Sequence, residues 1–473
     1  MSTPDAGAIG GESLVPGTKP QAELVDRVGV PASKSDSRVG EVIVFLMVPG
    51  LLLLDLGNGV LGVGNGIAGS LFTPGDLGRG VVLTAGLATI LTIRSRYLGE
   101  IERWLFVLLC LGLIGPFSAL VSYGDLAGFA YDLEALCKTL YGPVLIVTFL
   151  VVFLRFRVRP WYLLSVICVW GTLAAFCLII FQLLGIGSGT YEEFSSAHKG
   201  LFIAQNDLGL GLAISLAVTI YQLLYRPRLV CLCAFLLIEG GMFVLGTRVT
   251  IIGGVAIPLL VILAIRPKPS RARRLLPRMV LGGFLIFVVA YIAYQEVRSV
   301  EDQSYQMQKF VQLSEGDFTR VALLGSAFSY TFERGLWSSL FGDGANRYQR
   351  AVAGQLELPE DRGLAEIDWL DLWGAHGLLF VIALYSFYGL SLFRCASARF
   401  GDAPTLRWLL GFVVGLYLLH ATLAGHAMWS PIPSGVVAPI AALGWLAYVL
   451  RKWHVSEQYR GRATAPRSLV PAQ

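Results

Sequence analysis

Three carboxylates stand close together in the segment A-E-I-D-W-L-D-L-W-G-A-H-G. They are Glu366, Asp368 and Asp371, and His376 follows them. Helical spacing places Asp368 and Asp371 on one face, three residues apart, with Glu366 one turn or less above them. Carboxylates at a helix mouth can act as a general base on a hydroxyl group or hold that group in position. They can equally line a polar vestibule or pair with nearby arginines.

The segment G-T-R-V-T places Arg248 in a turn between two apolar runs. A guanidinium group is always protonated and planar, and it suits bidentate recognition of phosphate. A lone arginine at a membrane boundary can instead extend toward lipid headgroups. Arg248 is therefore a candidate anion-binding residue.

Two further segments carry polar candidates. The sequence A-H-K-G-L-F-I-A-Q-N-D-L-G brings His198, Asn206 and Asp207 to the start of an apolar run, where a polar pair is costly unless it caps, bonds a neighbour or faces a hydrated cavity. The segment 297–370 carries six arginines, among them Arg320 and Arg347. Most such charges solvate a surface. Arg320 lies on an amphipathic stretch and is the better candidate for an anionic ligand.

The amino-acid composition indicates whether these residues belong to a soluble protein or to a membrane protein. Of the 473 residues, 55% are hydrophobic and only 15% are charged, and the mean hydropathy is +0.66. An ordinary soluble domain carries about 25% charged residues. Too little polar surface remains to cover a compact soluble body, so the composition argues against a soluble enzyme, a disordered protein or a nucleic-acid binder. It favours a polytopic membrane protein.

Apolar runs long enough to cross about 30 Å of hydrocarbon recur along the chain. We expect twelve transmembrane helices in an all-α membrane protein. Their expected ranges are 41–58, 81–94, 104–122, 139–154, 161–181, 204–224, 229–246, 249–265, 279–296, 371–392, 405–423 and 434–450. Residues 1–40 and 451–473 lack periodicity, and we expect both to be disordered tails.

The distribution of Lys and Arg indicates on which side of the membrane each connecting segment lies. With the amino terminus in the cytoplasm, 26 of the 37 Lys and Arg fall on the cytoplasmic side, and seven of the other 11 lie in the segment 297–370. This distribution obeys the positive-inside rule and predicts that both termini are cytoplasmic. The chain then divides into transmembrane helices 1–9 over 41–296, one large outer loop over 297–370 and helices 10–12 over 371–450. A loop of that length usually carries function, and its stretch F-T-R-V-A-L-L-G-S-A-F predicts an amphipathic helix that ends before G-D-G-A-N.

Motifs of soluble enzymes are absent from the sequence. It has no G-x-x-x-x-G-K, no G-x-S-x-G and no H-E-x-x-H, and its seven cysteines show no zinc spacing. A nucleotide or metal enzyme is therefore not expected. Glu239 and Asp55 lie within apolar runs, where ionisable groups are functional candidates by default.

Four motifs occur in a fixed order over roughly residues 195–390: G-L-F-I-A-Q-N-D-L-G, G-T-R-V-T, R-V-A-L-L with L-F-G-D-G, and E-I-D-W-L-D-L-W-G-A-H-G. In this order, and with one large outer loop before the tenth span, the chain resembles the O-antigen ligase and polymerase superfamily. Members of that superfamily move glycans carried on undecaprenyl pyrophosphate at the periplasmic face of the bacterial inner membrane. The resemblance implies a glycosyltransferase that needs no metal or other cofactor.

The resemblance also assigns roles to residues. By position, Arg248 and Arg320 match arginines that hold the donor pyrophosphate, and Arg347 is grouped with them. Asn206 matches the asparagine of a G-x-F-x-x-x-N motif. Where a ligase usually has His-Asn, this chain has Glu366 and Ile367, although His198 could substitute.

This departure favours the polymerase branch, in which an E-x-D-x-x-D pattern is more familiar, with Glu366, Asp368 and Asp371 as catalytic candidates. The expected partners are a lipid-linked donor, a lipid-linked acceptor and membrane lipids, with a chain-length regulator and a flippase as further candidates and no nucleic acid. A ligase that transfers the glycan to a lipid or protein is the first alternative. A polysaccharide flippase or transporter is the second, although a transporter should concentrate its charges at the bilayer midplane.

Overall fold

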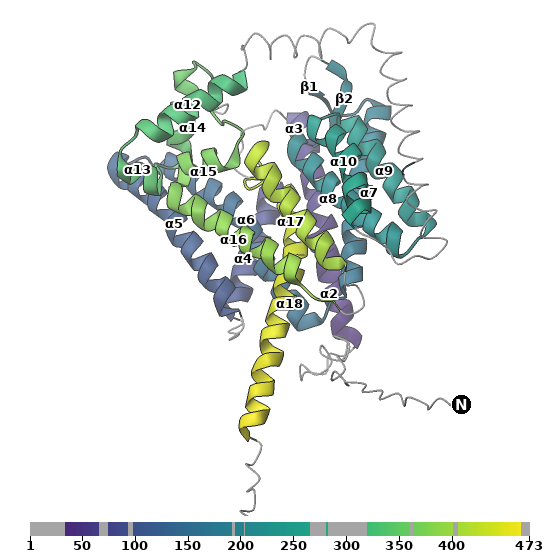
Figure 1. Cartoon of the computed structure of the whole chain (residues 1–473). Helices are drawn as coiled ribbons and strands as arrows, with labels where there is room; N and C mark the ends of the chain where they lie inside the picture. The colour runs from purple at the N-terminus through teal and green to yellow at the C-terminus, as the bar shows by residue number, and fades with distance from the viewer. Residues whose placement is uncertain are drawn as a thin grey trace, which may run out of the picture.

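The computed structural model describes residues 34–65, 74–92, 98–191, 194–202, 204–264, 281, 319–359, 363–400 and 405–464. Helices dominate these ranges (Figure 1). The helices are α2 (Lys34–Met47), α3 (Pro49–Asn65), α4 (Pro74–Thr92), α5 (Gly99–Tyr123), α6 (Leu126–Phe156), α7 (Pro160–Leu184), α8 (Gln205–Tyr225), α9 (Leu229–Leu245), α10 (Arg248–Ala264), α12 (Thr319–Glu333), α13 (Leu336–Phe341), α14 (Ala345–Gln355), α15 (Asp368–His376), α16 (Leu378–Ser397), α17 (Leu406–Leu423) and α18 (Pro431–Thr464). Two short antiparallel strands, β1 (Ser188–Tyr191) and β2 (Phe194–Gly200), form a hairpin before α8.

Eight helical stretches in the described part of the chain are long and apolar enough to cross a membrane, as an all-α membrane protein requires. They are Asp36–Val60, Gly99–Tyr123, Leu126–Phe156, Pro160–Leu184, Gln205–Tyr225, Leu378–Ser397, Leu406–Leu423 and Pro431–Trp453. Three shorter apolar helices, Leu77–Ile90, Leu229–Leu245 and Thr250–Ala264, coincide with the second, seventh and eighth expected spans. The ninth expected span, 279–296, lies outside the described residues apart from residue 281. The expected disordered tails are wrong where they adjoin the bundle, because α2 already begins at Lys34 and α18 continues beyond its apolar stretch to Thr464.

Local sequence signals mark where several of these helices begin or end. Asp125 caps α6, because its side chain accepts a hydrogen bond from the backbone N–H of Gly128 at 2.9 Å. Pro160 occupies the first turn of α7, where its missing N–H costs nothing. α7 then ends at Gly185, whose φ of 66° forms a left-handed C-cap.

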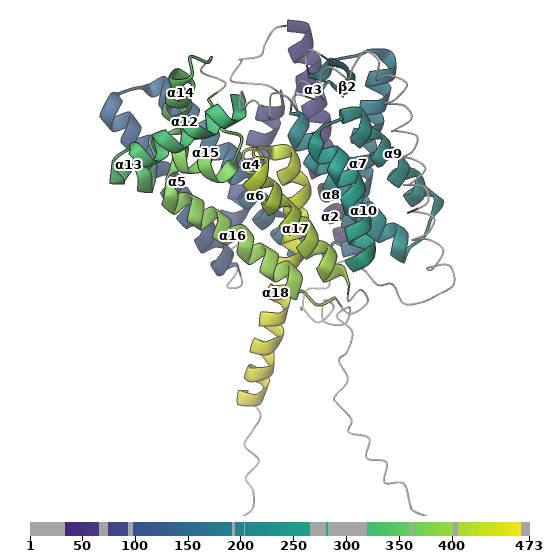
Figure 2. The same cartoon turned by 45° about the horizontal axis from the view of Figure 1, so that its top comes forward.

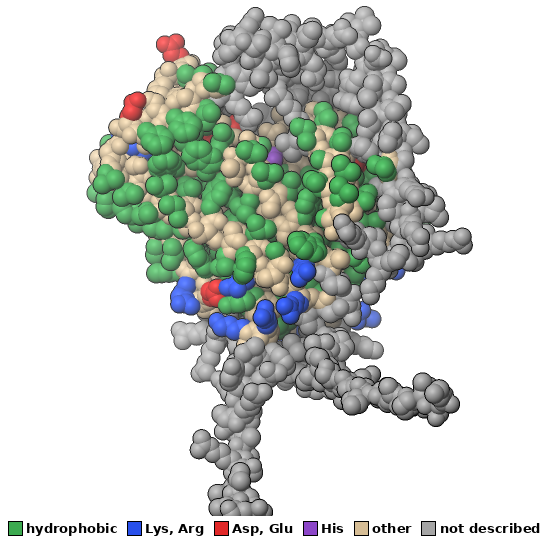
Figure 3. Space-filling model, viewed as in Figure 1, with side chains coloured by type: hydrophobic (Ala, Val, Ile, Leu, Met, Phe, Trp, Pro, Cys, Tyr) green, Lys and Arg blue, Asp and Glu red, His purple; other side chains and the backbone are tan. Residues whose placement is uncertain are grey.

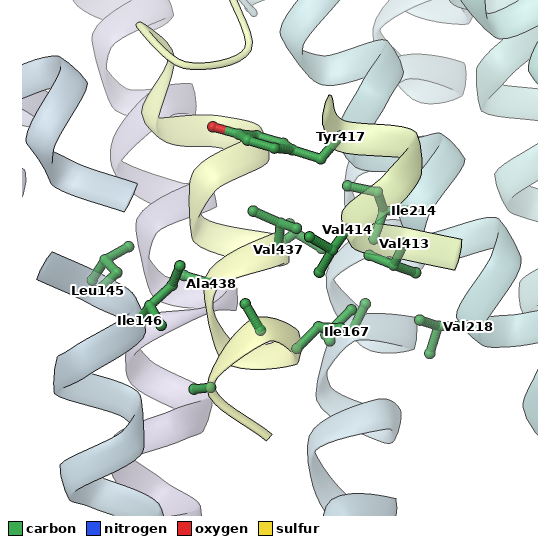
Figure 4. Packing of buried hydrophobic residues seen from close by; sticks show 14 of the residues in the cluster. Leu145, Ile146, Ile167, Ile214, Val218, Val413, Val414, Tyr417, Val437 and Ala438 are labelled. Carbon is green, nitrogen blue, oxygen red and sulfur yellow. The ribbon is translucent and has the colours of Figure 1, made fainter. Parts of the chain in front are cut away.

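Three helices form the interior of the bundle. In the most apolar stretch of each helix, the share of buried residues is 94% for α8 and 89% for both α6 and α18. The same share is only 28% for α5. Figure 4 shows Ile146 of α6, Ile214 of α8, Val414 of α17 and Val437 of α18 in this interior. The remaining spans surround these three and expose apolar side chains outward, as lipid-facing helices do.

The start of the tenth expected span, 371–392, is wrong, because the long apolar helix begins only at Leu378. Gly377 has a φ of 88°, and its Cα lies against the backbone of Leu340 and Phe341 in α13. The left-handed conformation of Gly377 interrupts the helix there, and the absence of a side chain allows the close contact with that backbone. Asp371 and His376 therefore belong to the separate short helix α15, and the apolar helix begins at Leu378.

The helices α12, α13 and α14 form a cap over one end of the bundle, and α15 joins the cap to α16 (Figure 2). The helix expected in the outer segment is present as α12 and α13, divided at Arg334–Gly335. Arg334 fixes the cap because its guanidinium donates to the carbonyls of Gly374 at 2.7 Å and Trp373 at 2.6 Å in α15.

Charge is distributed unevenly between the two ends of the bundle. Most described Lys and Arg side chains lie at the starts of α2 and α5, in the α6–α7, α8–α9 and α16–α17 connections, and in α18. Figure 3 shows basic side chains gathered at the lower end of a largely hydrophobic surface. The β hairpin, the cap and the α17–α18 connection occupy the opposite end.

Candidate functional site

Two unusual backbone segments meet at the end of the bundle that carries the cap. Glu366, just before α15, has a φ of 58°, and the α17–α18 connection holds Gly425 and His426 at 70° and 63°. Gly425 lies directly on the backbone of Glu366 and Ile367, so that no side chain fits there. Left-handed non-glycine residues are uncommon and gather at functional sites, where the surrounding structure holds them. Packing thus sets Glu366 beside His426.

Glu366 and His426 form an accessible ion pair. Nε2 of His426 lies 3.9 Å from Oε1 of Glu366, a distance typical of an ion pair and longer than a hydrogen bond. The side chain of Glu366 is 42% exposed and that of His426 is 28% exposed. Both groups can therefore meet a ligand that approaches from the cap end.

Two buried carboxylates stand behind this pair. Asp207 lies in the first turn of α8 and Asp368 in the first turn of α15. Burial by itself lowers the pKa of His426. The neighbouring Glu366, with the charges of Asp207 and Asp368, outweighs burial and raises that pKa to about 9. The imidazole is therefore a cation at neutral pH.

Only one of the two carboxylate oxygens of Asp368 accepts a hydrogen bond from the described residues. Its Oδ2 accepts a hydrogen bond from the backbone N–H of Met428 at 2.8 Å, while its buried Oδ1 has no hydrogen-bond partner among the described residues. Burial raises the pKa of Asp368 to about 7, and the Met428 bond and the His426 charge oppose that shift only in part. A carboxyl group with a pKa near neutrality can take up or release a proton at physiological pH.

Asp371 is placed differently from the other two carboxylates. Its oxygens accept hydrogen bonds from the hydroxyl of Tyr348 at 2.7 Å and from the backbone N–H groups of Ala365 at 2.9 Å and Ile367 at 3.2 Å. These contacts join α14 to the start of α15 and occupy the carboxylate. Asp371 therefore supports the site rather than facing a ligand.

A third ionic group lies deeper in the bundle. Arg79 of α4 forms an ion pair and hydrogen bond with Asp55 of α3. The charge of Arg79 also acts on Tyr141 of α6 and on Asp207. The Tyr141 hydroxyl and Oδ1 of Asp207 are buried with no hydrogen-bond partner among the described residues. Arg79, Tyr141 and Asp207 are thus further polar groups within α4, α6 and α8.

Four of the candidates from the sequence lie on elements at the same end. His198 pairs with Gly189 in the β hairpin, and Asn206 is in the first turn of α8. Arg248 is the first residue of α10, and Arg320 is the second residue of α12. The side chains of His198, Arg248 and Arg320 lie outside what the structure describes.

The start of α10 packs against Gly209 in the second turn of α8. A Cβ atom at Gly209 in α8 would lie 2.9 Å from Thr250 and 3.3 Å from Thr247. The backbone of Arg248, between these threonines, therefore adjoins this part of α8. The G-T-R-V-T motif thus lies beside α8 near the start of that helix, which carries Asn206.

Arg347 occupies a separate place. Its guanidinium lies 4.0 Å from the ring centroid of Tyr123 at the end of α5, beside a cavity between α5, α6 and α14. The hydroxyl of its neighbour Tyr348 points to Asp371 instead. Arg347 therefore does not join Glu366 and Asp368 in one group.

His426 and Arg79 are the functional candidates that sequence reasoning missed. The only sequence signal for His426 is a glycine-histidine pair in a short connection between two apolar runs. Arg79 lies at the edge of a weak apolar run, and its partner Asp55 is in the preceding helix. His376, by contrast, packs its ring on Phe380 and Trp429, and burial lowers its pKa to about 4, as for a neutral core histidine.

Among the residues that the structure describes, no three His, Cys, Asp or Glu side chains come together as metal ligands. Comparisons with protein-family models and with curated proteins give no match to this chain.

Proposed function

We propose that this protein is a membrane glycosyltransferase of the O-antigen ligase and polymerase superfamily, of the polymerase branch. It joins oligosaccharide repeat units, each carried on undecaprenyl pyrophosphate, into a surface or exported polysaccharide. The observation that carries the proposal is the accessible Glu366–His426 pair, which stands in front of buried Asp207 and Asp368 at the cap end. The four-motif resemblance supplies the substrate class.

We place the protein in the bacterial inner membrane with twelve spans, both termini in the cytoplasm and the cap in the periplasm. The gathering of basic side chains at the end opposite the cap supports this orientation. The eight long and three shorter apolar helices, together with the expected span 279–296, supply the twelve.

In the proposed reaction, the hydroxyl oxygen of the acceptor sugar attacks the anomeric carbon of the donor glycan. The new glycosidic bond forms as the bond from the anomeric carbon to the pyrophosphate oxygen breaks. Glu366 takes the hydroxyl proton, because it is the most accessible of the three carboxylates. Polyprenyl pyrophosphate leaves as an anion.

Cations at the cap end stabilise that anion. The His426 imidazolium lies within reach of whatever meets Glu366, and a fixed charge in a partly dehydrated site favours the developing negative charge. Arg248 and Arg320 are proposed to bind the pyrophosphate, and Asn206 to orient the substrate, on the strength of the resemblance and of their elements' positions.

The test uses a deletion strain read on a glycan gel. Loss of a polymerase leaves single repeat units on their lipid, loss of a ligase leaves long unattached chains, and loss of a flippase leaves neither at the outer face. Complementation then uses Glu366→Gln, with Glu357→Gln as the matched control. Glu357 lies in the same outer segment, is exposed and also has a left-handed backbone, with a φ of 54°. We expect Glu366→Gln to leave single repeat units and Glu357→Gln to restore long chains. Normal chain length with Glu366→Gln would overturn the assignment.

A further inference from the structure

The polar cavity beside Arg347 lies to the side of the carboxylate site, between the cap ends of α5 and α6 and the start of α14. It encloses about 170 Å³, and Tyr123, Asp132, Arg347 and Arg350 are among its lining residues. By the same measure one water needs about 10–15 Å³, so this cavity has room for a phosphate or diphosphate group.

The carboxylates of the cavity are already engaged in building its walls. Asp132 of α6 accepts a hydrogen bond from the backbone N–H of Asn346 at 2.7 Å, which ties α6 to the first turn of α14. Asp125 caps α6 through Gly128. Asp343 accepts from the Tyr330 hydroxyl at 3.1 Å and lies 3.7 Å from Arg334. Each acidic group therefore has a donor or cation of its own.

The two arginines point the cavity toward an anion. Arg347 and Arg350 lie one turn apart on α14 and are both exposed. The guanidinium of Arg347 rests on the ring of Tyr123, an arrangement that fixes its plane and leaves its N–H groups at the edge. Two guanidinium groups at one helical spacing suit the oxygens of a phosphate.

The surface next to the cavity is apolar. Val121 and Leu126, on the two sides of the α5–α6 turn, are 85% and 73% exposed. The helix α13, which packs against α5, also exposes Leu336 and Trp337. Phe129, in the cavity wall, packs on the exposed Phe117 with ring centroids 5.1 Å apart. The arginines thus adjoin a surface on which an isoprenoid chain can lie, at the level where aromatic residues mark a membrane boundary.

We propose that this lateral cavity binds the phosphate end of a polyprenyl phosphate or diphosphate lipid, with Arg347 as the main phosphate ligand. The proposal rests on the proposed function: polymerisation needs two lipid-linked molecules, and only one can place its pyrophosphate beside His426. The lateral cavity holds the second.

The test is photolabelling of the full-length protein in phosphatidylcholine nanodiscs with a benzophenone-bearing farnesyl diphosphate, followed by peptide mapping. We expect labelled peptides from the α5–α6 turn and α13. Arg347→Gln should reduce that labelling by about tenfold or more, and Arg347→Lys by less, because a charge-assisted bidentate contact is lost in the first case and only its fork in the second. Lys138→Gln is the control, since Lys138 is an exposed α6 cation paired with Glu134 and does not line the cavity.

Two labelling results would overturn the proposal: no label at the α5–α6 turn, or equal labelling in Arg347→Gln and wild type. A third would be that added phosphatidylglycerol reduces the labelling as well as unlabelled farnesyl diphosphate does, which would indicate a general anionic-lipid surface. The readout does not depend on polymerisation. If labelling behaves as expected while Glu366→Gln makes long chains, the cavity stands and the proposed function fails. If Glu366→Gln stops polymerisation while Arg347→Gln labels normally, the proposed function stands and the proposed lipid site in the cavity fails.

Discussion

Replacing Asp371 should destabilise the protein far more than replacing Asp368, although the two residues lie in one helical turn. In Asp371→Ala, the Tyr348 hydroxyl and the backbone N–H groups of Ala365 and Ile367 lose their acceptor inside the protein. Each donor left without a partner costs about 1–3 kcal/mol, so losing the acceptor of three donors should cost about 3–9 kcal/mol, and less where water takes its place. That is a large share of the roughly 5–15 kcal/mol that typically separates folded from unfolded protein.

In Asp368→Asn the expected cost is small. The amide oxygen can still accept from the Met428 N–H, and the removal of a buried charge offsets the cost of the new amide donor at the place of Oδ1. We expect this variant to unfold within about 1 kcal/mol of wild type, yet to lose the proposed polymerising activity, because the His426 cation loses one of the carboxylates that stabilise it.

The assay is thermal and denaturant unfolding of purified protein in one detergent, followed by intrinsic fluorescence, with chain formation measured on the same preparations. Asp371→Asn should fall between the two variants, because it keeps one acceptor oxygen and adds an unwanted donor. Wild-type stability of Asp371→Ala, or equal destabilisation of Asp368→Asn, would contradict these different roles of the two carboxylates.

Three further outcomes follow from the same geometry. The pKa of His426, about 9 in the folded protein and near 6.5 unfolded, predicts a stabilising contribution that is fully present below pH 6.5 and lost as the pH rises through 9; a His426→Asn variant should therefore differ from wild type in stability and activity at pH 6.5 but not at pH 10. Gly425→Ala should cost about 1–3 kcal/mol and most of the activity, measured by unfolding and chain formation, because its Cβ would meet the Glu366 backbone; unchanged values would contradict the packing. Arg79→Gln should reduce detergent stability by about 3–5 kcal/mol, and Asp55→Asn in the same chain should restore part of it; no rescue would argue against the ion pair.

Most of the span positions could be predicted because they depend on local hydropathy. A run such as Pro160–Leu184 needs only its own length and apolar character to be recognised. The start of the tenth span could not be predicted in this way, since the run through Leu372, Gly377 and Phe380 is apolar on both sides of the break. The break at Gly377 depends on contact with Leu340 and Phe341, which is a tertiary contact.

The site was predictable where its residues cluster in the sequence and not where they come from separate elements. The carboxylates of E-I-D-W-L-D stand out, but the pattern treats all three alike, and only the positions of Tyr348 and Met428 separate Asp371 from Asp368. His426 has no neighbouring polar residue to mark it. Its role depends on a left-handed turn that sets it beside Glu366, 60 residues earlier in the chain.

Chain formation by reconstituted protein tests the account most directly. Purified wild type, Glu366→Gln and the control Glu357→Gln would be placed in liposomes with a lipid-linked repeat unit, and glycan length and released polyprenyl pyrophosphate would be measured together. The account predicts equal amounts of new glycosidic bonds and released lipid for wild type and Glu357→Gln, and a loss of both by about two orders of magnitude or more for Glu366→Gln. Chain formation by Glu366→Gln at the rate of the control would contradict it.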